Sequence, residues 1–202
     1  MHPIQSAPQS PQHFIHLAGQ LLNTSTDSQT AHQALLSGEI LLETRSHTAW
    51  GGAVTAQMYL DQPRYRVWQE VTNYPRWVQF FPDITCSKVI DTPPEGRRGG
   101  TRLYQAARKA FLMLTAEVEV YLRVFEIANK DAWQSIQFYM EQGSFNDFFA
   151  DLKLQDYGAG TLLTYAVQAT PAVPVPSVVI QQAMRFDLPQ NMRSLRQAIC
   201  GS

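Results

Sequence analysis

Six successive segments between Pro82 and Pro171 have the character of β-strands, and they restrict the fold more than any other feature of the sequence. In the clearest segment, residues 116–126, aliphatic residues alternate with polar or charged ones. A period of two places successive side chains on opposite faces of a strand. Turns containing Pro, Gly, Asn or Asp separate several of the segments, which favours an antiparallel meander. The six predicted strands are residues 84–90, 101–107, 116–126, 133–140, 148–155 and 161–169.

A further strand and two short helices are predicted before this meander. Residues 53–60 alternate as a strand, and Asp61 and Pro63 after it are typical of a helix N-terminus. The side chains expected on the buried face of the first helix are Tyr65, Trp68 and Val71. The second helix ends before Pro82, and its aromatic side chains are Trp77, Phe80 and Phe81. Residues 39–43 form only a short apolar stretch.

A long helix is predicted from Ser177 onward. Its apolar residues recur every three or four positions and form one stripe, consisting of Ile180, Met184, Leu188, Met192, Leu195 and Ile199. Pro189 interrupts the pattern and predicts a kink or a break. A long antiparallel meander tends to curl, and one apolar stripe can fill its concave side. The order of elements therefore predicts an α+β helix-grip fold: a curved antiparallel sheet around a long C-terminal helix, with an apolar cavity between them.

Residues 1–37 are predicted to be an extension to a main domain of residues 38–202. The first 26 residues contain no Lys, Arg, Asp or Glu, and the opening Gln, Ser and Pro run is typical of disorder. Apolar residues then recur at helical spacing, at Phe14, Leu17 or Ala18, and Leu21. A second short helix is expected from Asp27 or Ser28 to Gly38. We expect these helices to dock on the main domain, with recruitment of a partner or a membrane-surface role as the alternative.

Composition restricts the partners and the compartment. The formal net charge is -1, with 16 basic and 17 acidic residues, so we expect no nucleic-acid partner. The longest apolar runs are too short for a transmembrane segment, and transient membrane contact stays open. A signal peptide is not expected, because the N-terminus lacks a positive region and a continuous apolar core. Two cysteines, Cys86 and Cys200, predict a reducing, cytoplasmic location. The oligomeric state is left undetermined.

Several local motifs are carried by the run AQMYLDQPRYRVWQEVTNYPRWVQFFPDITCSKVI at residues 56–90. They are Val67-Trp68, Thr72-Asn73-Tyr74, Trp77 and Phe81-Pro82, and a later turn runs from Gly158 to Thr161. With these motifs, residues 39–197 resemble the START-like (SRPBCC) superfamily of polyketide cyclase/dehydrase and lipid transport proteins, near the coenzyme Q-binding START proteins. The resemblance implies a helix-grip fold. It implies less about function, because this fold hosts carriers, cyclases and regulators.

Catalytic residues are not identified by the sequence. All five histidines, His2, His13, His16, His32 and His47, precede the region expected to form the cavity, so the usual general base is missing there. Neither cysteine has metal-ligand spacing, and no phosphate-binding loop is present, so no metal or cofactor is expected. The strand carboxylates, including Glu117, Glu119 and Asp151, alternate with an apolar face and are expected on a solvated outer surface.

Binding or carrying of a hydrophobic small molecule is the predicted function, with a lipid, an isoprenoid quinone or a polyketide-like compound as ligand. A cyclase or dehydratase acting on a polyketide-like or aromatic substrate is the alternative, and whether the chain is an enzyme is left open. Flat apolar walls are expected from Trp77, Phe81 and Phe138. Flexible lining is expected from Met140 and Met184, and orienting hydroxyls from Tyr104 and Tyr165.

Overall fold

The structure is a computed structural model that describes residues 25–94, 99–111, 114–129, 132–173 and 175–201. Within these residues eight strands form one antiparallel sheet in the order β1-β2-β8-β7-β6-β5-β4-β3. The strands are β1 Ile40–Ser46, β2 Gly52–Leu60, β3 Ile84–Asp91, β4 Thr101–Phe111, β5 Leu114–Asn129, β6 Trp133–Gly143, β7 Phe145–Tyr157 and β8 Gly160–Pro171. The helices are α2 Ser25–Leu36, α3 Arg64–Val71, the 3₁₀ helix η1 Tyr74–Arg76, α4 Trp77–Phe80 and α5 Ser177–Cys200.

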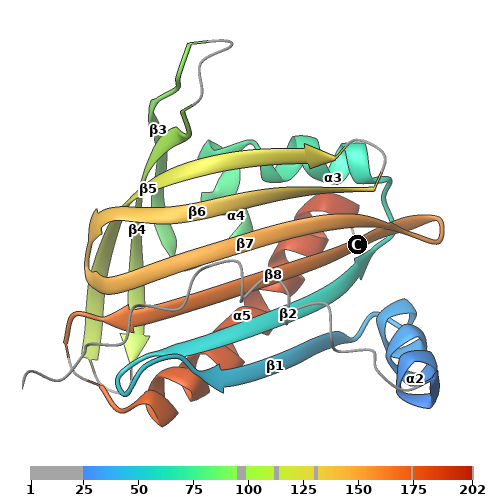
Figure 1. The fold of residues 1–202 in the computed structure, drawn as a ribbon, viewed down its shortest axis with the longest axis horizontal. Helices are drawn as coiled ribbons and strands as arrows, with labels where there is room; N and C mark the ends of the chain where they lie inside the picture. The colour runs from blue at the N-terminus through green and yellow to red at the C-terminus, as the bar shows by residue number, and fades with distance from the viewer. Residues whose placement is uncertain (1–24, 95–98, 112–113, 130–131, 174, 202) are drawn as a thin grey trace, which may run out of the picture.

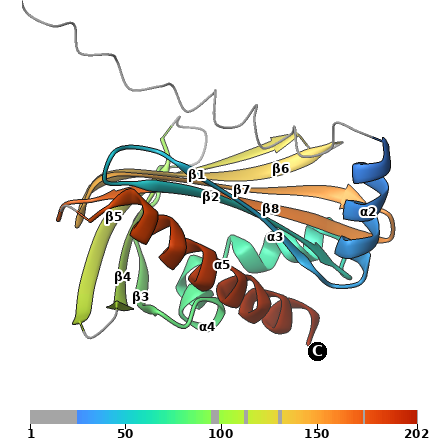
Figure 2. The same ribbon diagram turned by 90° about the horizontal axis from the view of Figure 1, so that it is seen from below.

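The sheet curves around the long helix α5, and Figure 1 shows α5 behind the sheet, running across its strands. Figure 2 shows α3, α4 and α5 on one side of the sheet, which we call the inner face, with α2 at one edge. The opposite side is called the outer face. This arrangement confirms the predicted helix-grip fold.

The alternation read from the sequence sets which side chains face α5. In β2, every second residue from Val54 to Leu60 is buried in the main core. Its partners across the sheet share that face, because Ala56 pairs with Tyr165 and Met58 pairs with Leu163 of β8. Removing each large aliphatic side chain from water contributes about 1.5–3 kcal/mol to stability, so this face accounts for much of the driving force for folding.

The edge strand β1 was not predicted as a strand. It pairs with β2 along its whole length, from Ile40 opposite Met58 to Ser46 opposite Gly52. Its residues come in pairs of similar burial rather than in strict alternation. A strand at the edge of a sheet can lack the period of two, which explains why the pattern gave only an apolar stretch.

The buried face of α3 differs from the prediction. Val67 and Val71 are fully buried, whereas Trp68 is only partly buried and Tyr65 is 60% exposed. Residues four positions apart lie on one side of a helix, so the Val67–Val71 pair defines the face that packs on the core. The expectation of a buried Tyr65 is therefore wrong.

The apolar stripe of α5 faces the sheet as predicted, with Leu188, Met192 and Leu195 buried. The predicted break at Pro189 does not occur, because the helix continues through this residue to Cys200. Pro189 is itself buried, so packing on the core offsets the lost backbone hydrogen bond. The helix ends at Gly201, which has the left-handed conformation that favours glycine at this position.

The turn from Gly158 to Thr161 brings β8 against the end of β2. Gly158 has a φ of +59°, and a Cβ atom at Gly160 would lie 2.3 Å from the carbonyl oxygen of Leu60. Only a residue without a side chain fits so close to a backbone oxygen. The hydroxyl of Thr161 also donates a hydrogen bond of 2.7 Å to the carbonyl oxygen of Gln62. This turn therefore fixes the chain at the point where it leaves β2 for α3.

Candidate ligand-binding site

An aromatic cluster occupies the inner face where α4 packs on the sheet. The ring centroid of Trp77 lies 5.0 Å from that of Phe81 and 5.1 Å from that of Phe138. Phe81 continues the contacts to Tyr165, 6.3 Å away on β8. The indole Nε1 of Trp77 donates a 2.9 Å hydrogen bond to the carbonyl oxygen of Val71, so its polar atom is satisfied. Four of the seven predicted site residues are thus brought together.

The two predicted methionines also lie on the inner side of the sheet. Met140 of β6 and Met184 of α5 are partly buried and pack against the main core. Gly52 of β2 leaves room for Met184, whose sulfur would lie 3.3 Å from a Cβ atom at that glycine. Unbranched thioether side chains adapt to differently shaped neighbours, so both residues suit a binding surface.

Tyr165 brings a phenol hydroxyl to the inner face. Its side chain packs on the main core but keeps partial exposure. Burial raises the pKa of Tyr165 well above its ordinary value, and that ordinary value already lies well above neutral pH, so the phenol is protonated there. A protonated phenol can donate a hydrogen bond to a carbonyl or hydroxyl group of a bound molecule.

The structure places Tyr104 on the outer face, away from the other predicted site residues. Tyr104 pairs with Tyr121 across β4 and β5, and the two ring centroids are 5.2 Å apart. A hydrogen bond to Glu119 and burial raise the pKa of Tyr104. The core residue Leu103 precedes it and points to the inner face. Tyr104 therefore does not join the aromatic cluster, and the expectation that it lines the inner cavity is not supported.

A chain of polar contacts, which sequence reasoning missed, ties η1 to the sheet. Gln105 donates to the hydroxyl of Ser87 at 3.2 Å, and Ser87 donates to the carbonyl oxygen of Tyr74 at 2.7 Å. The hydroxyl of Tyr74 donates to Glu126 at 2.7 Å. Burial, followed by this hydrogen bond, raises the pKa of Tyr74 far above its ordinary value. Tyr74 was part of the Thr-Asn-Tyr motif, and this fixed position is its structural role.

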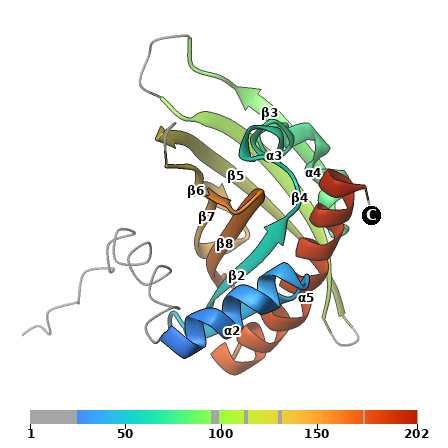
Figure 3. The ribbon, with the colours of Figure 1, turned by 90° about the vertical axis from the view of Figure 1, so that its right-hand side faces the viewer.

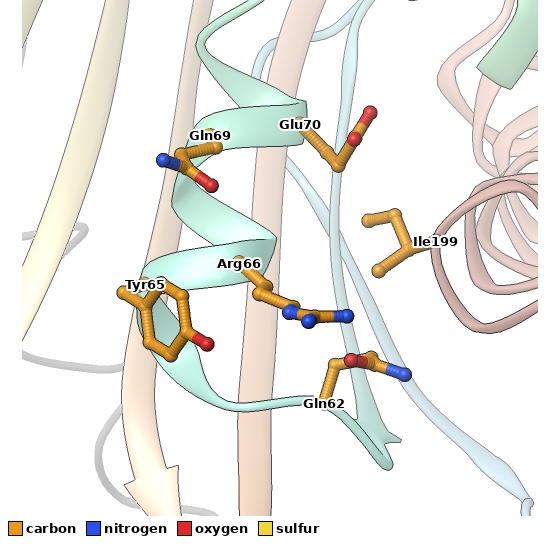
Figure 4. Close-up of a pocket in the computed structure, with 6 residues that line it drawn as sticks. All are labelled: Gln62, Tyr65, Arg66, Gln69, Glu70 and Ile199. Atoms are coloured by element: carbon orange, nitrogen blue, oxygen red, sulfur yellow. The ribbon is translucent and has the colours of Figure 1, made fainter.

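A surface pocket of about 440 Å³ lies between α3 and the C-terminal end of α5. Its lining is mostly polar, as Figure 4 shows: Gln62, Tyr65, Arg66, Gln69, Glu70 and Ile199. Glu70 also forms an ion pair with Arg76. An apolar ligand would meet one aliphatic side chain here, so this pocket is not the predicted cavity. The apolar cavity between the sheet and α5 stays a prediction.

Part of the outer face is buried rather than solvated. Asp151 of β7 is 7% exposed, and Phe149 beside it on the same face is 3% exposed. Ser135 donates a hydrogen bond to the carboxylate of Asp151. Burial raises the pKa of Asp151, and this hydrogen bond and Lys153 oppose the shift. The expectation of a solvated surface holds for Glu117 and Glu119 but is wrong for Asp151.

Replacing Asp151 with asparagine is expected to remove a pH-dependent component of stability. Because the native pKa is raised, the native state keeps its proton to a higher pH than the unfolded chain does. The free energy of unfolding of the wild type therefore falls as pH rises from about 4 through the native pKa, and this contribution is constant above it. Urea denaturation at a series of pH values measures the effect. The free energy of unfolding of Asp151→Asn, relative to that of the wild type, should increase as the pH rises through this window.

An exposed aspartate on β3 provides the control for this measurement. Asp91→Asn should follow the wild-type pH profile, because Asp91 lies at an exposed strand end. Parallel profiles for Asp151→Asn and the wild type would contradict the assignment of a raised pKa to Asp151.

The curved antiparallel sheet, the long helix that it grips and the aromatic inner face define a protein of the helix-grip class. The sequence matches the family described as polyketide cyclase / dehydrase and lipid transport over residues 60–196. This match spans more than half of the chain, and the protein belongs to this family. No curated protein gives a significant match to the sequence.

Solved structures have the same fold at low sequence identity. Human StAR-related lipid transfer protein 5 is similar with a TM-score of 0.65 and 12% identity, covering 91% of this chain and 97% of its own. The STAR-related lipid transfer protein from Xanthomonas axonopodis (fragment 25-204) has a TM-score of 0.63 and 12% identity, covering 79% and 93%. A START superfamily protein from Mycobacterium smegmatis has a TM-score of 0.61 and 15% identity, covering 73% and 96%. At such identities the likeness establishes the fold.

Proposed function

We propose that this protein binds and carries a hydrophobic small molecule between the sheet and α5, within a domain formed by residues 38–202. The observation that carries the proposal is the aromatic cluster on the inner face, flanked by Met140, Met184 and the hydroxyl of Tyr165. Binding sites for apolar molecules combine such walls with a few polar groups that fix orientation. The family, which includes lipid transport in its description, supports this function.

The ligand class follows from the same residues. Rings and thioethers suit flat or flexible apolar molecules, so the candidates are a lipid, an isoprenoid quinone or a polyketide-like compound. The Tyr165 phenol, which is protonated at neutral pH, would donate to an oxygen of the ligand. The resemblance to coenzyme Q-binding START proteins makes an isoprenoid quinone the first compound to test.

A cyclase or dehydratase function receives less support from the geometry. Tyr74 contacts Trp77 of the aromatic cluster, and its hydroxyl donates a hydrogen bond to the carboxylate of Glu126. Glu126 is exposed to solvent, and this hydrogen bond leaves neither group directed at a substrate. The raised pKa of Tyr74 makes it a poor proton source or base at neutral pH. The two described histidines are engaged elsewhere, His32 with Tyr157 and His47 with Asp147.

We also propose that the protein exchanges its ligand in the cytoplasm. None of the described helices is long and apolar enough to cross a membrane. Cys86 and Cys200 are both free thiols, which supports the reducing environment of the cytoplasm. An apolar ligand is poorly soluble in water, so the protein must take it from, and deliver it to, a membrane or another protein. We therefore propose that the protein contacts a membrane briefly when it is loaded.

Replacing Met184 with tryptophan is expected to weaken ligand binding at least about tenfold, equivalent to 1.4 kcal/mol. The larger ring would fill the space proposed for the ligand between α5 and the sheet, where Met184 now packs. Titration calorimetry with quinones, fatty acids and flat aromatic compounds measures the dissociation constants. Binding by the wild type should have a negative heat-capacity change and depend little on salt.

The same helix offers a matched control variant. Phe186 is 72% exposed on α5, so Phe186→Trp introduces the same ring at a position that faces solvent and should bind as the wild type does. The proposal is wrong in its present form if no compound binds to the wild type. If Met184→Trp and the wild type bound the ligand with equal affinity, the ligand would not lie between α5 and the sheet.

A further inference from the structure

Three small or aromatic residues form a buried apolar cluster on the outer face of the sheet. The outer cluster consists of Ala53 of β2, Phe149 of β7 and Ala166 of β8, with Tyr139 of β6 packed against it. The rings of Tyr139 and Phe149 lie 5.0 Å apart, centroid to centroid. All three cluster residues are almost completely withdrawn from solvent. A sheet face that is open to water does not bury an aromatic ring to this extent.

Polar side chains around the outer cluster are withdrawn from solvent as well. Gln57 donates a 3.2 Å hydrogen bond to Thr164, and both are buried. Ser135 and Asp151, also buried, bond to each other. These residues pair among themselves, as side chains do when water cannot reach them. The burial therefore extends over four neighbouring strands, β2, β8, β7 and β6.

The described helices do not supply this cover. Helices α3, α4 and α5 lie on the inner face, and α2 lies at the edge of the sheet (Figure 2). His32 of α2 contacts Tyr157 at the end of β7. Phe149 is eight residues from Tyr157 along β7, which corresponds to about 26 Å. The described helices therefore do not cover the outer cluster.

The chain that precedes α2 has the position and the length to provide it. Figures 2 and 3 show that α2 begins on the outer side of the sheet, because its N-terminal end points away from α5. Twenty-four residues precede Ser25. With residues 14–21 helical and the four steps from Leu21 to Ser25 extended, Phe14 can reach about 24 Å from Ser25, which is close to the distance along β7.

The composition of this segment matches the surface. Phe14, Leu17 and Leu21 recur at helical spacing and would give one apolar face. The segment contains no Lys, Arg, Asp or Glu, so placing it on an apolar face buries no full charge from these residues. If this apolar face were exposed to water instead, it would promote aggregation of the protein.

We propose that residues 1–24 fold back over the outer face of their own chain and cover the outer cluster with Phe14, Leu17 and Leu21. The occupant is thus a segment of the same molecule rather than a separate partner. The outer face then has a different role from the inner face, where ligand binding is proposed, and the two proposals can fail independently.

Hydroxyl-radical footprinting read by mass spectrometry tests this cover on the full chain. The double variant Leu17→Asp/Leu21→Asp should detach the segment, since each buried leucine contributes a factor of about ten or more to docking. Oxidation of Phe149 and Tyr139 should rise roughly tenfold. Oxidation of Trp77 and Phe138 should not change, which shows that the domain stays folded. The matched control Gln9→Asp/Gln12→Asp adds the same charge without removing apolar side chains and should resemble the wild type.

A milder variant and a size measurement complete the test. Leu17→Ala/Leu21→Ala keeps the segment uncharged and should give a smaller rise at Phe149. Light scattering of the wild type should give the mass of one chain at all concentrations. Unchanged oxidation of Phe149 in both leucine variants overturns the proposal. A wild-type dimer that dissociates in the double variant also overturns it, because a second copy would then be the cover.

Discussion

Replacing Trp77 with alanine is expected to lower the free energy of unfolding by about 3–5 kcal/mol, the usual range for a large aromatic side chain in a core. Trp77 is 3% exposed and lies between Phe81 and Phe138, so its removal leaves a void in the middle of the aromatic cluster. The carbonyl oxygen of Val71 would also lose its hydrogen bond from the indole. Chemical denaturation followed by circular dichroism measures the change.

A second tryptophan makes the comparison direct. Trp50 lies in the connection between β1 and β2 and is half exposed. Trp50→Ala is the same chemical change, and we expect an effect of about 0.5 kcal/mol or less. A loss below about 1 kcal/mol for Trp77→Ala would mean that the aromatic cluster is loosely packed.

Replacing Met192 with alanine is expected to cost about 2–5 kcal/mol. Met192 is fully buried in the middle of the stripe by which α5 packs on the sheet. Alanine has the highest helix propensity, so the substitution does not weaken the helix itself. Any loss seen in urea denaturation therefore measures the packing between α5 and the sheet.

The control for this prediction lies on the exposed side of the same helix. Gln190 is exposed and lies two positions before Met192, so Gln190→Ala should leave the free energy of unfolding unchanged or raise it slightly. Equal effects of Met192→Ala and Gln190→Ala would contradict the view that α5 is held by its apolar stripe.

Most of the fold could be predicted because its elements follow simple periods. The strands of the meander alternate, and α5 carries a stripe at spacings of three and four, so each element indicated its own buried face. The edge strand β1 and the buried face of α3 departed from these patterns. In α3, aromatic residues suggested one face, whereas the Val67–Val71 pair lies on the core.

The candidate site was predicted less completely, because a period of two separates two faces without saying which is inner. Tyr104 and Tyr165 both lie in alternating strands, yet only Tyr165 faces α5. A signal was available for Tyr104, since Arg102 shares its face while Leu103 lies on the other. Asp151 gave no such signal. Its burial depends on what lies over the outer face, and that is not encoded in β7 itself.

The order of strands has a consequence for how the chain is assembled during synthesis. β2 lies between β1 and β8, but β8 begins at Gly160, one hundred residues after β2 ends at Leu60. The ribosome therefore releases the β1–β2 hairpin long before its partner strand exists. Until then β2 has an unpaired edge and an apolar face in water, the features that promote wrong pairing between nascent chains. Closing a loop of this length also slows folding relative to proteins built from local contacts. The interval between translation of β2 and of β8 is thus the period in which the unpaired edge of β2 is open to pairing with a wrong strand.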